Sequence, residues 1–194
     1  GHYLADNFGD AVFNEMLKSD KVGIESINES LKNLGFNLSF ANVFRKWQIA
    51  NYLNDENVFG KEYGYLNPSL DFKIKPLMSH EIFEDSNDEF NYIVKDWQES
   101  PIEYYGDVKK INIEFEGKDD GVFDLSYVLN KKDGSVVMDS VNLINNKGSF
   151  SVDNFGGDFK SIVLFPFSKT KLSDFSKDSQ KRNFIVRIST GGKL

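Results

Sequence analysis

Histidine and cysteine, which commonly supply metal ligands and nucleophiles, are scarce in this chain of 194 residues. It has two histidines, His2 and His80, and no cysteine. A zinc-binding HExxH helix needs two histidines four residues apart on one face, but Glu84 stands where the second would follow His80. Without cysteine, disulfides, thiolate zinc sites and cysteine nucleophiles are excluded. We therefore expect no catalytic residue and no cofactor in this chain itself.

Three acidic residues close together in the sequence form a candidate calcium site. Asp119, Asp120 and Asp124 place hard oxygen ligands in and beside one turn, and Ca²⁺ prefers such ligands. Their spacing matches no defined calcium loop, and acidic hairpin tips commonly serve solubility alone. Calcium binding and a solvated turn are both open alternatives.

Three aromatic residues near the middle of the chain are candidates for stacking on a sugar ring: Trp97, Tyr104 and Tyr105. Their rings combine a large apolar face with a polar atom at the rim, which suits a sugar. The alternative is that these rings form the seam between two parts of the chain.

The net charge and the apolar pattern narrow the classes of partner. The formal charge of −7 repels polyanions, so nucleic acid is not an expected partner. No segment approaches the roughly 18 to 20 apolar residues of a membrane span, and no signal peptide is recognisable. The chain begins at Gly1 rather than Met, and we expect a missing upstream portion.

The first third of the chain has helical periodicity. Apolar residues recur at spacings of three and four between Tyr3 and Leu17, which predicts one helix, and again from Ile24 to Leu34. Ser39 is suited to cap a third helix, in which aromatic and aliphatic residues follow at helical spacing as far as Leu53. The 18 phenylalanines of the chain predict a core rich in large rings.

The chain after Pro101 has the pattern of β-strands. Ile111, Ile113 and Phe115 alternate with polar residues, and similar short segments follow, separated by turns such as "NKKDG" and "NNKG". The fold class predicted is α+β, with a small N-terminal helical subdomain followed by an antiparallel β-sandwich. The expected divisions are a helical subdomain at 1–60, a connector with short extended segments at 61–107, and the sandwich at 108–194.

Three segments resemble secreted bacterial zinc metallopeptidases of the immune inhibitor A type. They are "GIESINESL" at 23–31, "LSFANVFRKWQIANYLND" at 38–55 and "YGYLN" at 63–67. One departure is Lys46, where relatives commonly have Asp before the tryptophan. The residues that carry the resemblance are Gly23, Ile24, Phe40, Phe44, Trp47, Ala50, Asn51, Tyr52, Leu53, Tyr63, Gly64 and Tyr65.

The resemblance implies that these helices close the C-terminal side of a catalytic domain and lead into a β-sandwich. The HExxH helix and its zinc would then belong to an upstream domain of a secreted protein that acts on a protein substrate or at a cell surface. This chain would be its noncatalytic C-terminal portion, bracing the catalytic domain and supplying an accessory module. The candidate interface residues lie on the aromatic helix: Phe40, Phe44, Trp47, Ala50, Asn51, Tyr52 and Leu53.

Two alternatives stay open. One is a cell-surface adhesion or carbohydrate-binding protein in which the sandwich binds the ligand and the helices only cap it. The other is a degenerate peptidase, whose parent protein has lost its zinc site.

Overall fold

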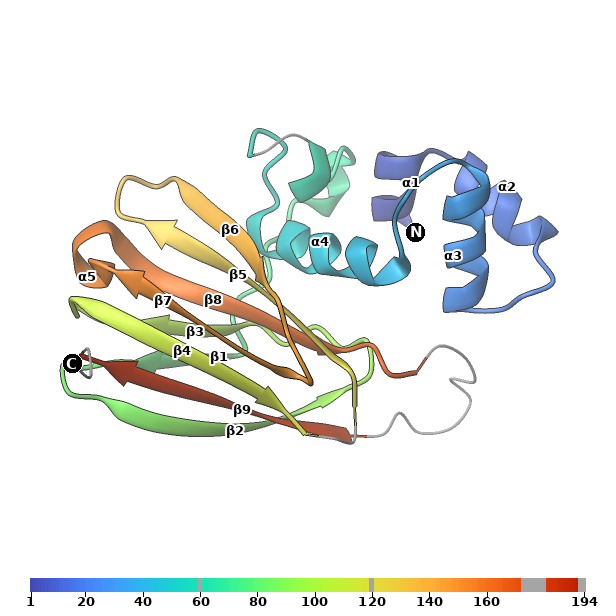
Figure 1. Cartoon of the computed structure of the whole chain (residues 1–194). Coiled ribbons are helices and arrows are strands. Elements are labelled where there is room, and N and C mark those ends of the chain that lie inside the picture. The colour runs from blue at the N-terminus through green and yellow to red at the C-terminus, as the bar shows by residue number, and fades with distance from the viewer. Residues whose placement is uncertain (59–60, 119–120, 172–180, 192–194) are drawn as a thin grey trace. The chain divides into compact units, whose positions relative to one another are not determined.

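The computed structural model describes residues 1–58, 61–118, 121–171 and 181–191. The chain divides into two compact units, a helical unit containing Gly1–Lys75 and a sandwich unit containing Pro76–Thr170 together with the last strand. Figure 1 shows the helices of the helical unit in blue and cyan and the strands from green to red. The predicted α+β class is confirmed.

Among the described residues, four α-helices build the helical unit. They are α1 (His2–Phe8), α2 (Ala11–Lys18), α3 (Ile24–Asn33) and α4 (Phe40–Leu53), followed by short 3₁₀ turns η1 (Lys61–Tyr63) and η2 (Pro68–Leu70). The sequence predicted one helix from residue 3 to 17, but the structure has two. Gly9 follows α1 with φ of 74°, a conformation that glycine adopts at little cost and that ends the helix.

The start of α4 is fixed by a capping box, which confirms the predicted cap at Ser39. The Asn42 backbone N–H donates to the Ser39 hydroxyl, and the Ser39 backbone N–H donates to Asn42 Oδ1 at 2.9 Å. Two otherwise unpaired amides at the helix start are satisfied in this way. Val43 and Ala50 of α4 then pack into a small core with Tyr3 and Leu31.

Two sheets build the sandwich unit. The strand order is β1-β3-β8-β5-β6 in the first sheet and β2-β9-β4-β7 in the second. Among these described strands, β1 with β3 is the only parallel pair. The strands are β1 (Met78–Glu81), β2 (Asn87–Lys95), β3 (Ile102–Tyr105), β4 (Lys110–Gly117), β5 (Phe123–Lys131), β6 (Val136–Val141), β7 (Lys147–Asp153), β8 (Phe159–Ser168) and β9 (Lys181–Thr190). A short helix, α5 (Phe155–Asp158), precedes β8.

The sandwich core lies between the sheets and contains the predicted face of β4. Ile111, Ile113 and Phe115 are buried there with Leu125 and Leu164 of the other sheet. Because side chains alternate along a strand, the intervening residues face outward, and these positions are available for a site.

The division of the chain differs from the one expected. The sandwich unit begins at Pro76, so β1, β2 and β3 lie within the 61–107 segment that was expected to be a connector. β2 pairs along its whole length with β9, which follows it by almost a hundred residues. This pairing between distant segments turns an apparent connector into the edge of a sheet.

Candidate functional site

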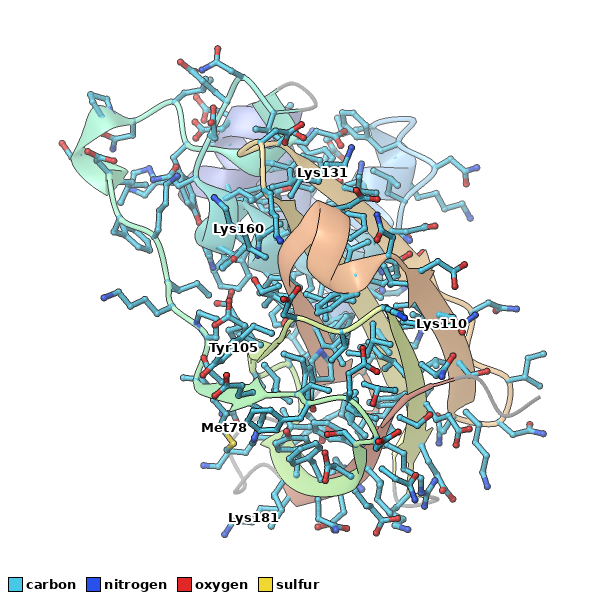
Figure 2. All side chains as sticks on the ribbon, turned by 90° about the vertical axis from the view of Figure 1, so that its left-hand side faces the viewer. Met78, Tyr105, Lys110, Lys131, Lys160 and Lys181 are labelled. Carbon is cyan, nitrogen blue, oxygen red and sulfur yellow. The ribbon has the colours of Figure 1, made fainter. Side chains whose placement is uncertain are left out.

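A pocket of about 470 Å³ lies on the outer face of the five-stranded sheet. We call it the Tyr105 pocket; its walls come from β3, β5, β8 and the β5–β6 turn. The lining residues are Glu103, Tyr105, Asn130, Lys131, Gly134, Ser135, Lys160 and Ser161. Figure 2 shows the labelled Tyr105, Lys160 and Lys131 on one side of the sandwich.

The floor of the Tyr105 pocket is one row of residues across three strands. Tyr105 of β3 pairs with Ser161 of β8, and Ser161 pairs with Asn130 of β5. The Asn130 amide donates a hydrogen bond to the Ser161 hydroxyl at 2.9 Å. An aromatic ring, a hydroxyl and an amide therefore stand in line on one face.

A β-bulge shapes one end of the pocket. Asn130 pairs with Ser161, but Lys131 pairs with Phe159, so Lys160 is an extra residue in β8. A bulge bends the strand and redirects a side chain, and here it places Lys160 beside Lys131 in the pocket wall. In the turn between β5 and β6, Gly134 has φ of 90°, a conformation that other residues rarely adopt.

The structure does not bring the three predicted sugar-stacking residues together. Tyr105 is 38% exposed, whereas Tyr104 has no exposed surface and belongs to the sandwich core. Adjacent residues on a strand point to opposite faces, so only one of the two can reach a ligand. Trp97 follows β2, and its ring packs against Phe167 with centroids 5.7 Å apart. Of the three, Tyr105 is the one that lines this pocket in the part of the chain that the structure describes.

Tyr104 instead belongs to a buried cluster that the sequence did not indicate. The Tyr92 hydroxyl lies 2.9 Å from both the Tyr104 hydroxyl and His80 Nε2, and the His80 ring packs against Phe90 with centroids 4.3 Å apart. Burial raises the pKa of Tyr92 to about 12 and raises that of Tyr104 as well. Burial also lowers the pKa of His80, although Asp88 opposes this. The cluster joins β1, β2 and β3 and stabilises the edge of the sandwich.

The acidic calcium candidates are only partly described. Asp124 is buried and forms an ion pair with Lys169, with 3.1 Å between Oδ2 and Nζ. Asp119 and Asp120 lie outside the described residues. Within the described ranges, no group of three or more acidic residues or histidines is arranged to hold a metal ion. Calcium binding therefore stays a prediction.

Several of the candidate interface residues on the aromatic helix α4 contact one another or the segment that follows the helix. The Trp47 indole N–H donates to the Tyr65 hydroxyl at 2.7 Å, and that hydroxyl donates to Asn51 Oδ1. The Phe44 ring contacts the rings of Phe40 and Trp47. The remaining candidates differ in exposure: Ala50 and Leu53 are buried, and Tyr52 is half-buried.

A second polar groove, of about 700 Å³, lies on the four-stranded sheet and is here called the Asn112 groove. Its amide groups are engaged by neighbours: the Ser151 hydroxyl donates to Asn112 Oδ1 at 2.8 Å, and Asn112 Nδ2 donates to the Ser189 carbonyl at 3.3 Å. The one aromatic residue that lines it, Phe150, is stacked on Tyr127. The polar side chains of the Tyr105 pocket are hydrogen-bonded as well, so the exposed ring of Tyr105 is what makes that pocket better suited to a ring-shaped ligand.

Comparisons with known proteins found weak structural similarities only. No family model and no curated protein sequence matches the chain. The pre-peptidase C-terminal domain of a Bacillus anthracis collagenase aligns with a TM-score of 0.36 and 10% identity, covering 60% of this chain and 100% of that domain. A periplasmic inhibitor of g-type lysozyme from Aeromonas hydrophila aligns with a TM-score of 0.36 and 5% identity, covering 59% and 96%.

A xylan-binding domain from Paenibacillus barcinonensis aligns with a TM-score of 0.27 and 12% identity, covering 54% of this chain and 71% of that one. Because these TM-scores are low, the function proposed below rests on the residues of this chain. No helix among the described residues has the length and apolar character needed to cross a membrane.

Sequence reasoning identified one residue of the Tyr105 pocket and missed its partners. Asn130 and Lys131 stand in "LNKKDG", which indicated only a hairpin turn. The sequence signal that could have identified Tyr105 as the exposed residue was the alternation of side chains along β3, which places Tyr105 and Tyr104 on opposite faces of the sheet. The bulge at Lys160 leaves no such signal, because it depends on the pairing of β8 with β5.

Proposed function

We propose that this chain is a noncatalytic accessory region whose β-sandwich binds carbohydrate through the Tyr105 pocket. One observation carries the proposal: an exposed tyrosine ring stands beside a hydroxyl and an amide in a pocket of about 470 Å³. Pockets that hold small ligands typically have volumes of about 300 to 1,000 Å³.

The residues of the pocket match the two kinds of surface on a sugar. The C–H face of a pyranose ring is apolar and packs on an aromatic face, for which Tyr105 is the available ring. The sugar hydroxyls both donate and accept hydrogen bonds, as do the amide of Asn130 and the hydroxyls of Ser135 and Ser161.

The position of Tyr105 favours binding at low entropic cost. β3 is hydrogen-bonded to β1 on one side and to β8 on the other, so the backbone under Tyr105 is held in a sheet. A tyrosine has few rotatable bonds, and ordering it costs less than ordering a long flexible side chain.

A glycan array tests the proposal. The full chain is expected to bind at least one class of oligosaccharide, and Tyr105→Ala is expected to weaken binding by about tenfold or more, the effect of losing roughly 1.4 kcal/mol. Phe83→Ala is a matched control, because Phe83 is an aromatic residue of the sandwich unit that is 62% exposed and lines neither the Tyr105 pocket nor the Asn112 groove. A blank array would contradict the proposal.

A second candidate function concerns the helical unit and rests on the resemblance to zinc metallopeptidases. In this second candidate function, the helical unit would brace an upstream, zinc-containing catalytic domain of a secreted protein. The favouring observation is that Trp47 and Asn51 of one resembling segment share the hydroxyl of Tyr65 in the next. Two sequence segments that carry the resemblance thus form one local structure.

This second candidate is tested by adding the chain to the domain encoded upstream of Gly1. We expect the isolated chain to hydrolyse no peptide bonds and to raise the melting temperature of the upstream domain. Peptidase activity of the chain itself, above that of a mock-purified sample, would contradict the noncatalytic role. An unchanged melting temperature would contradict the bracing role.

A further inference from the structure

We infer that the Tyr105 pocket selects sugars that carry an anionic group, and that Lys131 and Lys160 bind that group. The inference rests on the proposed function and adds the chemical class of the ligand. The shared chemistry is an acidic oxygen group on a sugar ring, either a carboxylate or a sulfate.

The two lysines enter the pocket from neighbouring strands. Lys131 is the last residue of β5, and Lys160 is the extra residue of the bulge in β8. Both line the pocket, with Lys131 half-buried and Lys160 exposed. Figure 2 shows both labels on the same side of the sandwich as Tyr105.

Neither lysine is neutralised by an ion pair among the described residues, which distinguishes them from several other lysines. Lys110, Lys147 and Lys169 each lie within 3.1 Å of a carboxylate oxygen. No such contact within 4.0 Å is formed by Lys131 or Lys160 across the described part of the chain. In a protein with a net charge of −7, two lysines that line one pocket make it locally more attractive to an anion.

Glu103 is the carboxylate among the residues that line the pocket, and it stands on the other side of the tyrosine. Asp133 precedes Gly134 in the adjoining turn, and its pKa is lowered first by the hydrogen bonds that it accepts from Ser135 and in part by the charge of Lys131. Glu103 is two residues before Tyr105 on β3 and pairs with Val163, whereas Tyr105 pairs with Ser161. Lys160 precedes Ser161, so the row formed by Tyr105, Ser161 and Asn130 separates the lysines from Glu103. Glu103 also accepts a hydrogen bond from the Ser79 hydroxyl at 2.9 Å.

This separation of charge gives a bound sugar one orientation. Its anionic group would lie toward Lys131 and Lys160, its ring over Tyr105, and its neutral hydroxyls toward Glu103, which accepts hydrogen bonds. A carboxylate or sulfate near Glu103 would be repelled. Charge-assisted hydrogen bonds from lysine to an anionic oxygen are stronger than neutral ones, so the charged end fixes the register.

The test uses the full chain and two forms of one probe. The probe is a hexasaccharide of galacturonic acid, and its methyl ester serves as the neutral form with the same ring. Calorimetric titration at low salt is expected to show about tenfold tighter binding of the acid than of the ester, as two partly exposed charge contacts would give. The preference is expected to shrink as salt screens the charges.

Lysine variants show which side chains cause the preference for the acid over the ester. Lys131→Gln with Lys160→Gln is expected to bring acid and ester to within about twofold of each other, while Lys181→Gln keeps the tenfold preference. Lys181 is exposed at the start of β9, and Figure 2 shows its label far from those of Lys131 and Lys160. A sulfated oligosaccharide of κ-carrageenan, tested in parallel, distinguishes sulfate from carboxylate as the preferred anion.

The outcomes separate this inference from the proposed function. If the acidic probe binds more tightly, and if this binding depends on the two lysines and on Tyr105, the result supports both the inference and the proposed function. Equal binding of acid and ester, with loss in Tyr105→Ala, overturns the inference and leaves the proposed function standing. An acid preference that survives the double substitution also overturns it, because the anion would then bind elsewhere. No binding of any probe overturns the inference, and a blank glycan array would overturn the proposed function with it.

Discussion

Tyr104 and Tyr105 show how a single strand serves the core and the pocket at once. The ring of Tyr104 is buried between the sheets with Tyr92, whereas Tyr105 faces outward beside Ser161. Because the cluster around Tyr104 holds β1, β2 and β3 together, it also supports the backbone under Tyr105. Residues that never touch a ligand therefore affect the geometry of the pocket.

A buried ion pair makes the first prediction at the residue level. Arg182 reaches both carboxylate oxygens of Asp96 at 3.3 Å, both residues are buried, and the Ser168 hydroxyl also donates to Asp96. Asp96→Ala would leave the guanidinium without this partner, and we expect the free energy of unfolding in urea to fall by about 3 kcal/mol. Asp153→Ala, which removes an exposed partner of Lys110, should cost less than about 1 kcal/mol. Similar losses in the two variants would contradict the prediction.

The half-buried His80 makes a second prediction, on the pH dependence of stability. Burial holds the pKa of folded His80 below the 6.5 of the unfolded chain. As pH falls through 6.5, the unfolded state takes up a proton that the folded state does not, so stability decreases until the pH reaches the folded pKa. Unfolding in urea between pH 8 and about 5.5 should therefore show a steeper loss of stability in the natural chain than in His80→Gln.

Other titratable groups do not change the sign of this effect. Asp88 raises the pKa of His80 but does not outweigh burial. Glu116, whose ion pairs with Arg187 and Lys147 lower its pKa to about 2, loses its contribution to stability only at lower pH. Parallel curves for the natural chain and His80→Gln would show that His80 does not carry the pH dependence.

At the level of elements, the capping box decides where α4 begins. Ser39→Ala removes the hydroxyl that accepts from the Asn42 backbone N–H, and we expect a loss of about 1 kcal/mol in the free energy of unfolding. Ser39→Asp keeps an acceptor at the same position and should retain most of that stability. If Asp is as destabilising as Ala, the cap does not act through this hydrogen bond.

The contact between α4 and the segment after it makes another prediction at this level. Tyr65→Phe removes the hydroxyl shared by Trp47 and Asn51, and the expected cost is about 1 kcal/mol of stability. Tyr63→Phe is a matched control in the same segment. Trp47 fluorescence should shift only in Tyr65→Phe, and an equal shift in both variants would contradict the assigned contact.

At the level of the whole molecule, local patterns predicted the fold class but not the division into units. Ser39 and the periodicity that follows it marked α4, and the alternation at Ile111, Ile113 and Phe115 marked β4. The strand β2 has the same signal in Phe90, Tyr92 and Val94. Its place in the sandwich depends on β9, almost a hundred residues away, and no local pattern reveals that pairing.

The candidate site was likewise only partly predictable, because local sequence patterns do not reveal which distant strands pair. An exposed aromatic residue was predictable at Tyr105, but its partners come from β8, which pairs with β3, and from β5, which pairs with β8, both across long sequence separations. The bulge that redirects Lys160 arises from the register of those strands. Individual residue types were thus readable from the sequence, while their assembly into a pocket was not.

The most direct measurement is an NMR titration of the full chain, with ¹³C-labelled tyrosine rings, against the oligosaccharide that binds best on the array. The predicted result is a saturable shift of the Tyr105 ring signals, with little change at the buried Tyr92 and Tyr104. Shifts confined to Tyr127, whose ring stacks on Phe150 of the Asn112 groove, or saturation of binding with Tyr105 unchanged, would contradict carbohydrate binding at the Tyr105 pocket.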